Sequence, residues 1–393
     1  MTNQHDPSAP IPDMPENQPG AHQPGAQLSG SVPAPADSTS AAAPAQPNPQ
    51  VSSQQARVQP ASSLVDRLAQ DHQLTDVDHE LRARFGAVSS ATANAVVGQG
   101  HATHALLIAL LTGGHVLLEG VPGVAKTLLV RALSHAVELD HARIQFTPDL
   151  MPSDVTGSTI YDAKTGDFEF RPGPVFTNIL IADEINRTPP KTQSALLEAM
   201  EEKQVSVDGN TYSLPKPFLV AATQNPIEYD GTYPLPEAQL DRFLFKVQMN
   251  LPQRDAELDI LQRHAGGFAA DKLADAGVTP QIDAEGILAA RERVADVYCA
   301  PEVLGYIVDL VQATRQAPSL ELGVSPRGAT RLLSAARAHA WLYGRAFITP
   351  DDIKFLVPIS FRHRVRLNPE AHMDGLDVDD VLESIVSTVA VPR

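Results

Sequence analysis

The stretch Gly120-Val121-Pro122-Gly123-Val124-Ala125-Lys126-Thr127 decides how this sequence is interpreted. It follows residues 115–119, an apolar run typical of a buried strand, and precedes residues 128–137, which have the spacing of an amphipathic helix. A glycine-rich turn at such a junction binds phosphate, because backbone N–H groups and the helix N-terminus face the anion. The lysine adds positive charge, and the threonine hydroxyl can ligate Mg²⁺. The stretch therefore predicts a phosphate-binding loop.

One position departs from the general spacing G-x-x-x-x-G-K-[ST]: Ala125 stands where the second glycine is usual. Alanine is the smallest departure from glycine and tolerates helical backbone angles, so we expect the loop to close. The alternative is an ordinary strand-to-helix turn that happens to end in Lys-Thr. The rest of the chain must decide between the two.

Composition narrows the class of protein. The chain has 393 residues, enough for roughly two or three domains, and a formal net charge of −17. This charge argues against binding to a nucleic-acid backbone, which needs a basic face, and is compatible with a basic or neutral protein partner. The single cysteine, Cys299, excludes an intramolecular disulfide and a cysteine-based zinc site and suits a reducing cytosol.

His101 and His104 lie three apart on a predicted helix, and we expect surface or packing roles for them.

The chain has no apolar run long enough to cross a bilayer. Its N-terminus lacks the basic segment and apolar core of a secretory signal, so we expect a cytoplasmic protein that reaches a membrane only through a partner. Residues 1–60 are rich in Pro, Ala, Gln, Ser and Gly and show no apolar periodicity. This composition predicts a flexible tail, because it offers too little apolar surface to offset the entropy of ordering.

Strand and helix patterns alternate after this tail, from about residue 61 to residue 251. Helical spacing occurs at 64–85, 101–111 and 191–202, and buried-strand patterns occur at 143–146, 178–182 and 218–222. This alternation predicts a three-layer α/β core with a largely parallel sheet. Two segments inside it, 158–170 and 205–214, alternate around turn residues and predict β-hairpins.

Strand patterns vanish after about residue 252, and we expect a helical domain over 252–393. Its predicted helices are 283–297, 301–316, 326–342 and 350–357. Ser325-Pro326 and Thr349-Pro350 are good N-cap and first-turn pairs for two of them.

Polar side chains follow two of the predicted strands where each strand ends. Asp183 and Glu184 come directly after an apolar run, at the edge where parallel sheets bind ligands. Asp183 would hold Mg²⁺ through water opposite Thr127, and Glu184 would polarise the attacking water. Asn225 would donate to the γ-phosphate or position that water. The alternatives are a solvated acidic turn and an Asn-Pro turn.

Two arginines are further candidates. Arg242 lies in an otherwise apolar stretch, where it would either pair with Glu237 or Asp241 or reach a neighbouring subunit's phosphate as an arginine finger. Arg327 lies in the first turn of a predicted helix, where a cation opposes the helix dipole, so nucleotide phosphate is a natural partner. Arg331 competes with it for this role, and a surface arginine is the other alternative.

These segments occur in the order found in AAA+ ATPases. The stretch Ala182-Asp183-Glu184-Ile185-Asn186-Arg187-Thr188-Pro189-Pro190-Lys191-Thr192-Gln193 resembles the MoxR family. Val97, Gly98 and Gln99 also resemble that family, in which they help to hold adenine. The resemblance covers residues 63–393.

The resemblance implies binding of ATP with Mg²⁺ and assigns a role to each candidate. The loop from Gly120 to Thr127, with Leu128 after it, is identified as the Walker A motif, and Asp183 with Glu184 as Walker B. Asn225 corresponds to sensor 1, Arg242 to the arginine finger and Arg327 to sensor 2. The two hairpins correspond to the helix-2 insert and the pre-sensor-1 insert, which face the pore of a ring. Ala125 is usual in this family's loop.

The function implied is an ATP-hydrolysing ring, expected to be a hexamer, with each site shared between two subunits. Similar proteins remodel or mature protein complexes or insert cofactors, often with a von Willebrand factor A partner, and the client is not readable from the sequence. The alternatives are the ATPase motor subunit of a metal chelatase and a non-hydrolysing nucleotide-dependent scaffold. Glu184 and Asn225 argue against the scaffold, because a pure binder needs neither. Nucleic-acid remodelling is disfavoured by the charge.

Overall fold

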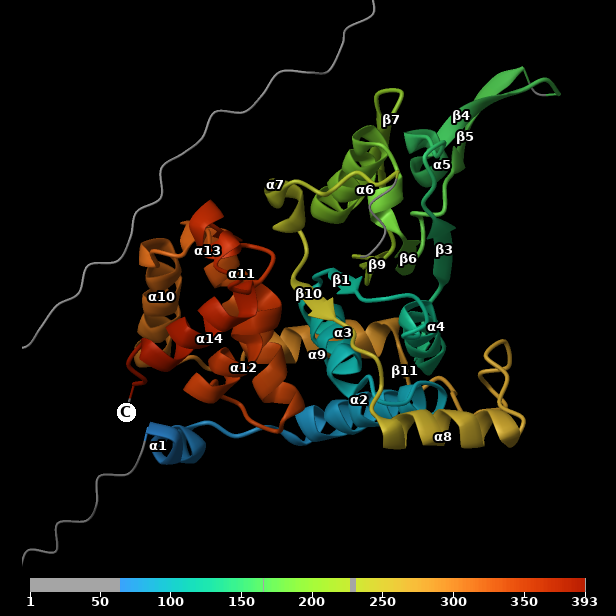
Figure 1. Cartoon of the computed structure of the whole chain (residues 1–393). Coiled ribbons are helices and arrows are strands. Elements are labelled where there is room, and N and C mark those ends of the chain that lie inside the picture. Colours follow the sequence, from blue (N-terminus) through green and yellow to red (C-terminus); the bar gives the residue numbers. More distant parts are fainter. Residues whose placement is uncertain (1–63, 165, 227–230, 393) are drawn as a thin grey trace, which may run out of the picture. The chain divides into compact units, whose positions relative to one another are not determined.

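A five-stranded parallel sheet with the order β10-β1-β9-β6-β3 lies at the centre of the fold (Figure 1). The structure is a computed structural model that describes residues 64–164, 166–226 and 231–392. The strands are β1 (Val116–Glu119), β3 (His141–Gln145), β6 (Ile179–Asp183), β9 (Leu219–Gln224) and β10 (Phe245–Gln248). The predicted α/β class is confirmed. The strand pattern missed β10, in which polar side chains alternate with apolar ones.

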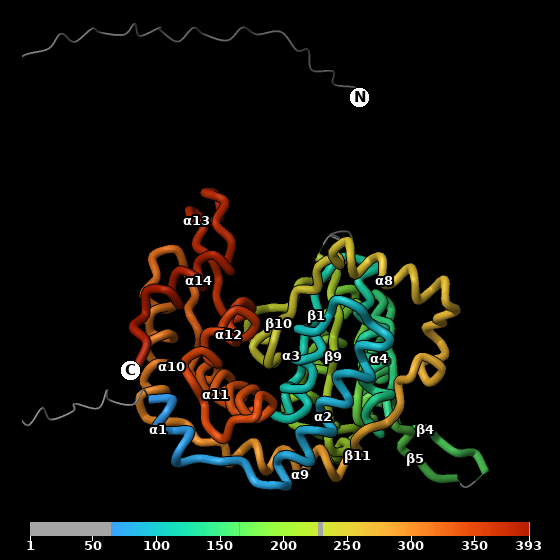
Figure 2. The backbone as a smooth tube through the Cα atoms, turned by 90° about the horizontal axis from the view of Figure 1, so that it is seen from below, coloured from blue at the N-terminus to red at the C-terminus, as the bar shows by residue number. Residues whose placement is uncertain are grey.

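The sheet is covered on both faces, which is why its central strands are apolar throughout. Successive side chains of a strand point to opposite faces, and β1 divides accordingly. Val116 and Leu118 join one hydrophobic cluster, with residues of α2 (Asp76–Ala95), α3 (Gly100–Thr112) and α4 (Lys126–Ala136), whereas Leu117 joins the other. Figure 2 shows these three helices along one face. The second cluster packs against α6 (Pro190–Glu202). The three-layer prediction is therefore correct.

The register of the sheet brings three strand ends together. Glu119 at the end of β1 pairs with Gln224 at the end of β9, and Ala182 of β6 pairs with Ala222 of β9. Because the strands are parallel, their carboxyl ends meet at one edge. The segments that follow β1, β6 and β9 therefore lie side by side there.

Both predicted hairpins are present. The first pairs β4 (Gly157–Asp162) with β5 (Asp167–Pro172), and the second pairs β7 (Gln204–Val207) with β8 (Asn210–Ser213). Figure 1 shows the β4–β5 ribbon extending away from the sheet. Phe170 stacks on Tyr212 with ring centroids 4.0 Å apart, so an aromatic contact joins the two hairpins.

Helices make up most of the chain after the sheet. They are α8 (Arg254–Ala265), α9 (Ala284–Ala295), α10 (Pro301–Gln316), α11 (Pro326–Leu342), α12 (Pro350–Phe361), α13 (Pro369–Met373) and α14 (Val378–Thr388). The helix α8 was not predicted, and α12 continues through Pro358 in its last turn instead of ending before it. The absence of strands was also a wrong prediction, because the short strands β11 (Ile282–Asp283), β12 (Leu320–Leu322) and β13 (Arg366–Leu367) occur here.

The segment 64–85 forms two helices rather than one. The first, α1 (Leu64–Asp71), ends before Thr75, whose side chain and that of Asp78 form a capping box that starts α2. The remaining short elements are β2 (Val137–Glu138), α5 (Pro152–Thr156), the 3₁₀ helix η1 (Ile185–Arg187) and α7 (Glu237–Leu240).

The described residues belong to one compact unit that spans residues 60–393. One hydrophobic cluster continues from α2 and α3 into α11 and α12. The division of residues 61–393 at residue 252 stays a prediction. The predicted tail, residues 1–60, lies outside the described residues. No described helix is long and apolar enough to cross a membrane.

Candidate nucleotide site

The predicted phosphate-binding loop lies between β1 and α4. A side chain at Gly120 would place its Cβ 2.5 Å from the carbonyl oxygen of Met249, so only glycine fits there. Gly123 has a φ of +89°, a left-handed conformation that glycine adopts without strain. Lys126 donates from Nζ to the carbonyl oxygen of Gly120 and, at 3.2 Å, to that of Val121. The loop and its lysine thus form one closed turn at the start of α4.

Ala125 does not have the helical backbone angles that we expected. Its φ is 65° and its ψ is 27°, the left-handed region that glycine favours. An alanine in this conformation costs roughly 1–2 kcal/mol, because its Cβ approaches the following carbonyl oxygen. The loop therefore closes with local strain at Ala125. The general motif has glycine at this position because glycine adopts the left-handed conformation without that strain.

Asp183 lies at the centre of the polar contacts below the loop. Its carboxylate, only 5% exposed, accepts a hydrogen bond from Thr127 Oγ1 at 3.1 Å and from Thr223 Oγ1 at 3.2 Å. Arg143 donates from Nε to the other carboxylate oxygen at 2.7 Å. A hydroxyl and a carboxylate in contact are hard oxygen donors of the kind that Mg²⁺ prefers. Thr127 and Asp183 therefore fit a magnesium ion chemically, and their role in holding one stays a prediction.

Glu184 adopts a left-handed conformation, with φ 57° and ψ 50°. Its N–H donates to Thr223 Oγ1 at 3.0 Å. Its carboxylate oxygen Oε2 accepts from Gln145 Nε2 at 2.7 Å and from Arg187 Nη1 at 2.9 Å. Strained backbone angles of this kind persist where surrounding contacts over-determine them and are common at active sites. The carboxylate is thus held in one place by two donors.

A polar cavity of about 350 Å³ brings these groups together. Its lining includes ten of the predicted residues: Pro122, Gly123, Val124, Ala125, Lys126, Thr127, Leu128, Asp183, Glu184 and Asn225. Sequence reasoning missed three more lining residues, namely Arg143, Gln145 and Thr223. All three lie on β3 or β9, near the strand ends at the binding edge, and that position was the signal that could have identified them.

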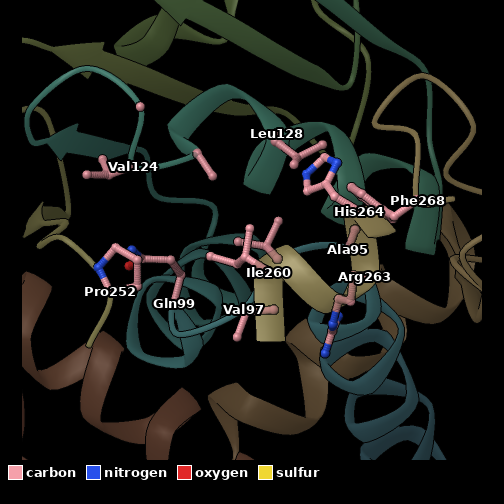
Figure 3. Close-up of a pocket in the computed structure, with 13 residues that line it drawn as sticks. Ala95, Val97, Gln99, Val124, Leu128, Pro252, Ile260, Arg263, His264 and Phe268 are labelled. Atoms are coloured by element: carbon pink, nitrogen blue, oxygen red, sulfur yellow. The ribbon is translucent and has the colours of Figure 1, made fainter. Parts of the chain in front are cut away.

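Figure 3 shows the residues that line a second cavity, which is apolar and has a volume of about 230 Å³. Both cavities are lined by Gly123, Val124, Ala125 and Leu128, so a single ligand can occupy the two. Val97 and Gln99 line the apolar cavity as predicted, while Gly98 forms the left-handed turn between them. Sequence reasoning missed seven lining residues of this cavity: Ala95 and Val96 at the end of α2, and Pro252, Ile260, Arg263, His264 and Phe268 from α8 and its flanks.

Arg242 and Arg327 are brought together, but away from this cavity. Arg242 Nε lies 3.2 Å and Arg327 Nη2 lies 2.8 Å from the carboxylate of Glu201 at the end of α6. Arg327 also lies 4.0 Å from Asp241. The alternative of an intrachain ion pair for Arg242 is present in the structure, but its partner is Glu201 and not Glu237 or Asp241. Neither arginine is among the described residues that line the polar cavity.

Arg331 lies one turn after Arg327 on α11. Burial lowers the pKa of its guanidinium, and the nearby charge of Arg327 lowers it further.

The two histidines predicted to lie at the surface or to pack contact protein atoms: a ring nitrogen of His101 lies 3.0 Å from the carbonyl oxygen of Gln248, and one of His104 lies 2.8 Å from His339 Nδ1. Within the described ranges, no group of three or more His, Cys, Asp and Glu side chains is placed to hold a metal ion.

Comparison with known proteins gives consistent matches. Residues 115–245 match the ATPase family associated with various cellular activities (AAA), and residues 312–385 match the AAA lid domain. The chain is 54% identical to the uncharacterized protein YeaC of Bacillus subtilis, over 73% of this chain and 88% of that protein. It is 43% identical to the chaperone MoxR1 of Mycobacterium tuberculosis, over 76% of this chain and 80% of that protein.

A crystal structure of a protein from Cytophaga hutchinsonii matches with a TM-score of 0.74 and 40% identity, over 81% of this chain and 98% of that one. The magnesium-chelatase 38 kDa subunit of Acidiphilium rubrum is more distant, with 26% identity over 76% of this chain and 98% of that protein. These values favour the MoxR proteins over the chelatase subunits as relatives.

Proposed function

This chain belongs to the MoxR family of AAA+ ATPases, and on that premise we propose that it binds ATP with Mg²⁺ and hydrolyses it. One observation carries the proposal: an apolar cavity shares four lining residues with a polar one that combines the predicted phosphate loop, an oxygen donor pair suited to Mg²⁺ and a second carboxylate. The apolar part suits a nucleobase and the polar part suits a triphosphate. The second carboxylate is what a protein that only binds nucleotide would not need.

Each residue of the polar cavity has a proposed task. Lys126 and the loop amides bind the phosphate oxygens, while Thr127 and Asp183 hold Mg²⁺, which when bound neutralises phosphate charge. Glu184 orients the attacking water and accepts its proton. Asn225 donates to the γ-phosphate or to that water.

We further propose that Arg242 and Arg327 act on the nucleotide of a neighbouring subunit. Their position beside Glu201, outside the cavity of their own chain, supports this arrangement. A site completed by a second copy requires head-to-tail contacts, which close into a ring, and we expect six subunits. Arg242 is the proposed arginine finger and Arg327 the proposed sensor 2 residue, with Arg331 as the competing choice.

The proposed cellular role is chaperone-like remodelling or maturation of a protein complex, including cofactor insertion, in the cytoplasm. The relative named chaperone MoxR1 supports the chaperone part. The protruding β4–β5 and β7–β8 hairpins would face the pore and contact an unidentified protein client, alone or with a von Willebrand factor A partner. No nucleic-acid partner is proposed, given the net charge of −17.

The first test separates binding from turnover. Lys126→Ala is expected to abolish binding of a fluorescent ATP analogue. Glu184→Gln should keep that binding and reduce kcat at least about a hundredfold, because it removes the carboxylate that orients water. Glu198→Gln makes the same chemical change on an exposed side chain of α6 and should change neither quantity. Unchanged hydrolysis in Glu184→Gln would refute the catalytic assignment.

A second test addresses the shared site. Arg242→Ala and Lys126→Ala subunits are each expected to be inactive alone, and a mixture should regain part of the activity, because each variant supplies the half that the other lacks. A mixture that stays inactive at every ratio contradicts the trans role. Affinity capture with the Glu184→Gln variant, which holds ATP without turning it over, is the experiment that would identify the client.

The two alternatives predict different results. A non-hydrolysing scaffold would bind ATP and show no turnover that depends on Glu184. A chelatase motor would support insertion of Mg²⁺ into a porphyrin when combined with its partner subunits.

A further inference from the structure

Arg364 is one of the most deeply buried charged residues in the described part of the chain, with 4% of its surface exposed. It follows α12 in the helical region and lies against the segment 241–244, which joins α7 to β10 and includes Arg242. A buried guanidinium is costly unless carboxylates or carbonyl oxygens satisfy it. The contacts of Arg364 therefore indicate what its burial achieves.

Those contacts fall on both sides of Arg242. Arg364 Nε donates to Asp241 Oδ1 at 2.6 Å, and Nη2 donates to the carbonyl oxygens of Asp241 at 3.3 Å and Phe243 at 2.6 Å. Nη1 donates to the carbonyl oxygen of Leu244 at 3.2 Å and to that of Ser360. Arg242 is thus the one residue of 241–244 whose backbone is not bonded to Arg364, and its neighbours are held on either side.

The same side chain also contacts the segment that carries Arg327. A Cβ added at Gly328 would lie 3.0 Å from Arg364 Cδ, so the first turn of α11 packs closely on the arginine stem. Asp241, the carboxylate partner of Arg364, lies 4.0 Å from Arg327. One buried guanidinium therefore fixes both segments that present arginines to the face beside Glu201.

We propose that Arg364 is a positioning residue for the ATPase site shared between subunits, because it fixes Arg242 and Arg327 to the helical region as one rigid unit. The inference rests on the proposed function. The segment 241–244 also continues into β10, and Leu244 N–H donates to the carbonyl oxygen of His115 at 2.8 Å, so Arg364 holds the arginines where the helical region meets the sheet. Lysine cannot replace the bonds that Arg364 makes, because it is a point charge without the planar fork of arginine.

The test is Arg364→Lys, which keeps a cation next to Asp241 but cannot make the same set of carbonyl bonds. We expect kcat to fall about 10- to 100-fold, because a displacement of roughly 1 Å can cost 10²-fold, while the Kd for ATP stays unchanged. Arg362→Lys is the matched control. Arg362 is two residues earlier, pairs with Asp379 at 3.0 Å and donates to the carbonyl oxygen of Lys246 at 3.5 Å, but makes no hydrogen bond to the described segment 241–244, so its variant should keep wild-type kcat.

Two readouts separate positioning from simple loss of structure. In the Arg242→Ala background, Arg364→Lys should cause little further loss of kcat, because both changes remove one function. Mixed with Lys126→Ala subunits, Arg364→Lys should regain activity as Arg242→Ala does, since its defect lies on the face that serves the neighbour. Asp241→Asn, which leaves Arg364 in place, should show the same pattern if Arg364→Lys does not fold.

Each outcome bears on a defined statement. If Arg242→Ala lowers kcat but Arg364→Lys adds its full loss in that background, or lowers ATP affinity, the inference is overturned and the proposed function stands. If Lys126→Ala lowers kcat and Arg242→Ala does not, the shared site itself is wrong, and the inference falls with it. Full activity of Arg364→Lys in a folded protein also overturns the inference.

Discussion

Replacement of Asp78 by asparagine should destabilise the protein strongly, because this carboxylate joins three helices. Asp78 lies in the first turn of α2 and is 1% exposed. It accepts two hydrogen bonds from Arg293 of α9, both at 2.9 Å, and one from Trp341 Nε1 of α11 at 3.0 Å. Thr75 adds bonds from its N–H and its hydroxyl. Asparagine has the same shape, but one carbonyl oxygen and an NH₂ group would face these donors.

The magnitude follows from how buried the pair is. Removing one partner of a buried ion pair costs about 3–5 kcal/mol. The side chain of Arg293 is 34% exposed, so water can reach it, and we expect the lower end, about 3 kcal/mol. This is a large share of a typical stability of roughly 5–15 kcal/mol. Urea denaturation at pH 7 without nucleotide measures it directly.

Asp76→Asn is the matched control, because Asp76 lies in the same turn but is exposed. It should lose only its interaction with the helix dipole, at most about 1 kcal/mol. A difference of less than about 1 kcal/mol between the Asp78→Asn variant and the wild type would refute the reasoning, given the 3–5 kcal/mol expected for a broken buried pair.

The pH dependence provides a second check on Asp78. Burial opposes ionisation, but the bonds from Arg293, Thr75 and Trp341 outweigh it and hold the pKa of the carboxyl well below its usual range. A depressed folded-state pKa gives stability that is present above the unfolded pKa, near 3.9, and is lost as the pH falls through the folded value. The gap between wild type and Asp78→Asn should therefore be constant from pH 8 to 6 and narrow only below about pH 4. A gap that narrows between pH 8 and 6 contradicts this.

Two further predictions concern the nucleotide site. Ala125→Gly should change the free energy of unfolding by less than about 0.5 kcal/mol, because relief of left-handed strain and the greater unfolded-state entropy of glycine nearly cancel. Ala125→Val should lower the free energy of unfolding by about 1–3 kcal/mol and weaken ATP binding. Thermal denaturation and a binding titration measure the two effects. Gln145→Ala should lower kcat about tenfold at unchanged Kd, because Arg187 still holds the Glu184 carboxylate, and an unchanged kcat would show that Gln145 does not position it.

The phosphate side of the site could be predicted from the sequence because its signals are local. Lys126 and Thr127 follow a buried strand at a fixed spacing, and Asp183 and Glu184 follow another. Parallel strands place the residues that follow their carboxyl ends at the same edge of the sheet, independently of the structure of the connecting loops. The same logic, applied to the strand ends of β3 and β9, would have added Gln145 and Thr223.

The apolar cavity proposed for the nucleobase and the pairing of Arg242 and Arg327 with Glu201 could not be predicted from such local signals. Pro252, Ile260 and Phe268 reach the apolar cavity only because α8 packs across the ends of α2 and the loop, a contact with no local pattern. The left-handed conformation of Ala125 is also a tertiary result, because alanine has no intrinsic preference for it. The pairing of Glu201 with Arg242 and Arg327 joins residues that are far apart in sequence.

In the proposed ring, the groups that bind a subunit's own nucleotide and the groups that reach the neighbour's nucleotide are held by different parts of the chain. The groups proposed for binding and water attack are fixed to strand ends of the sheet, so they hardly move relative to one another. The groups proposed for the neighbour's phosphate lie where the helical region meets the sheet, because the segment 241–244 is bonded to Arg364 and continues into β10. A shift of the helical region that disturbs the bonds of Arg364 would thus displace both arginines while leaving the strand-end groups of the subunit's own polar cavity in place. In this arrangement, the conformation of one subunit affects ATP hydrolysis in the next through the contacts that hold Arg242 and Arg327.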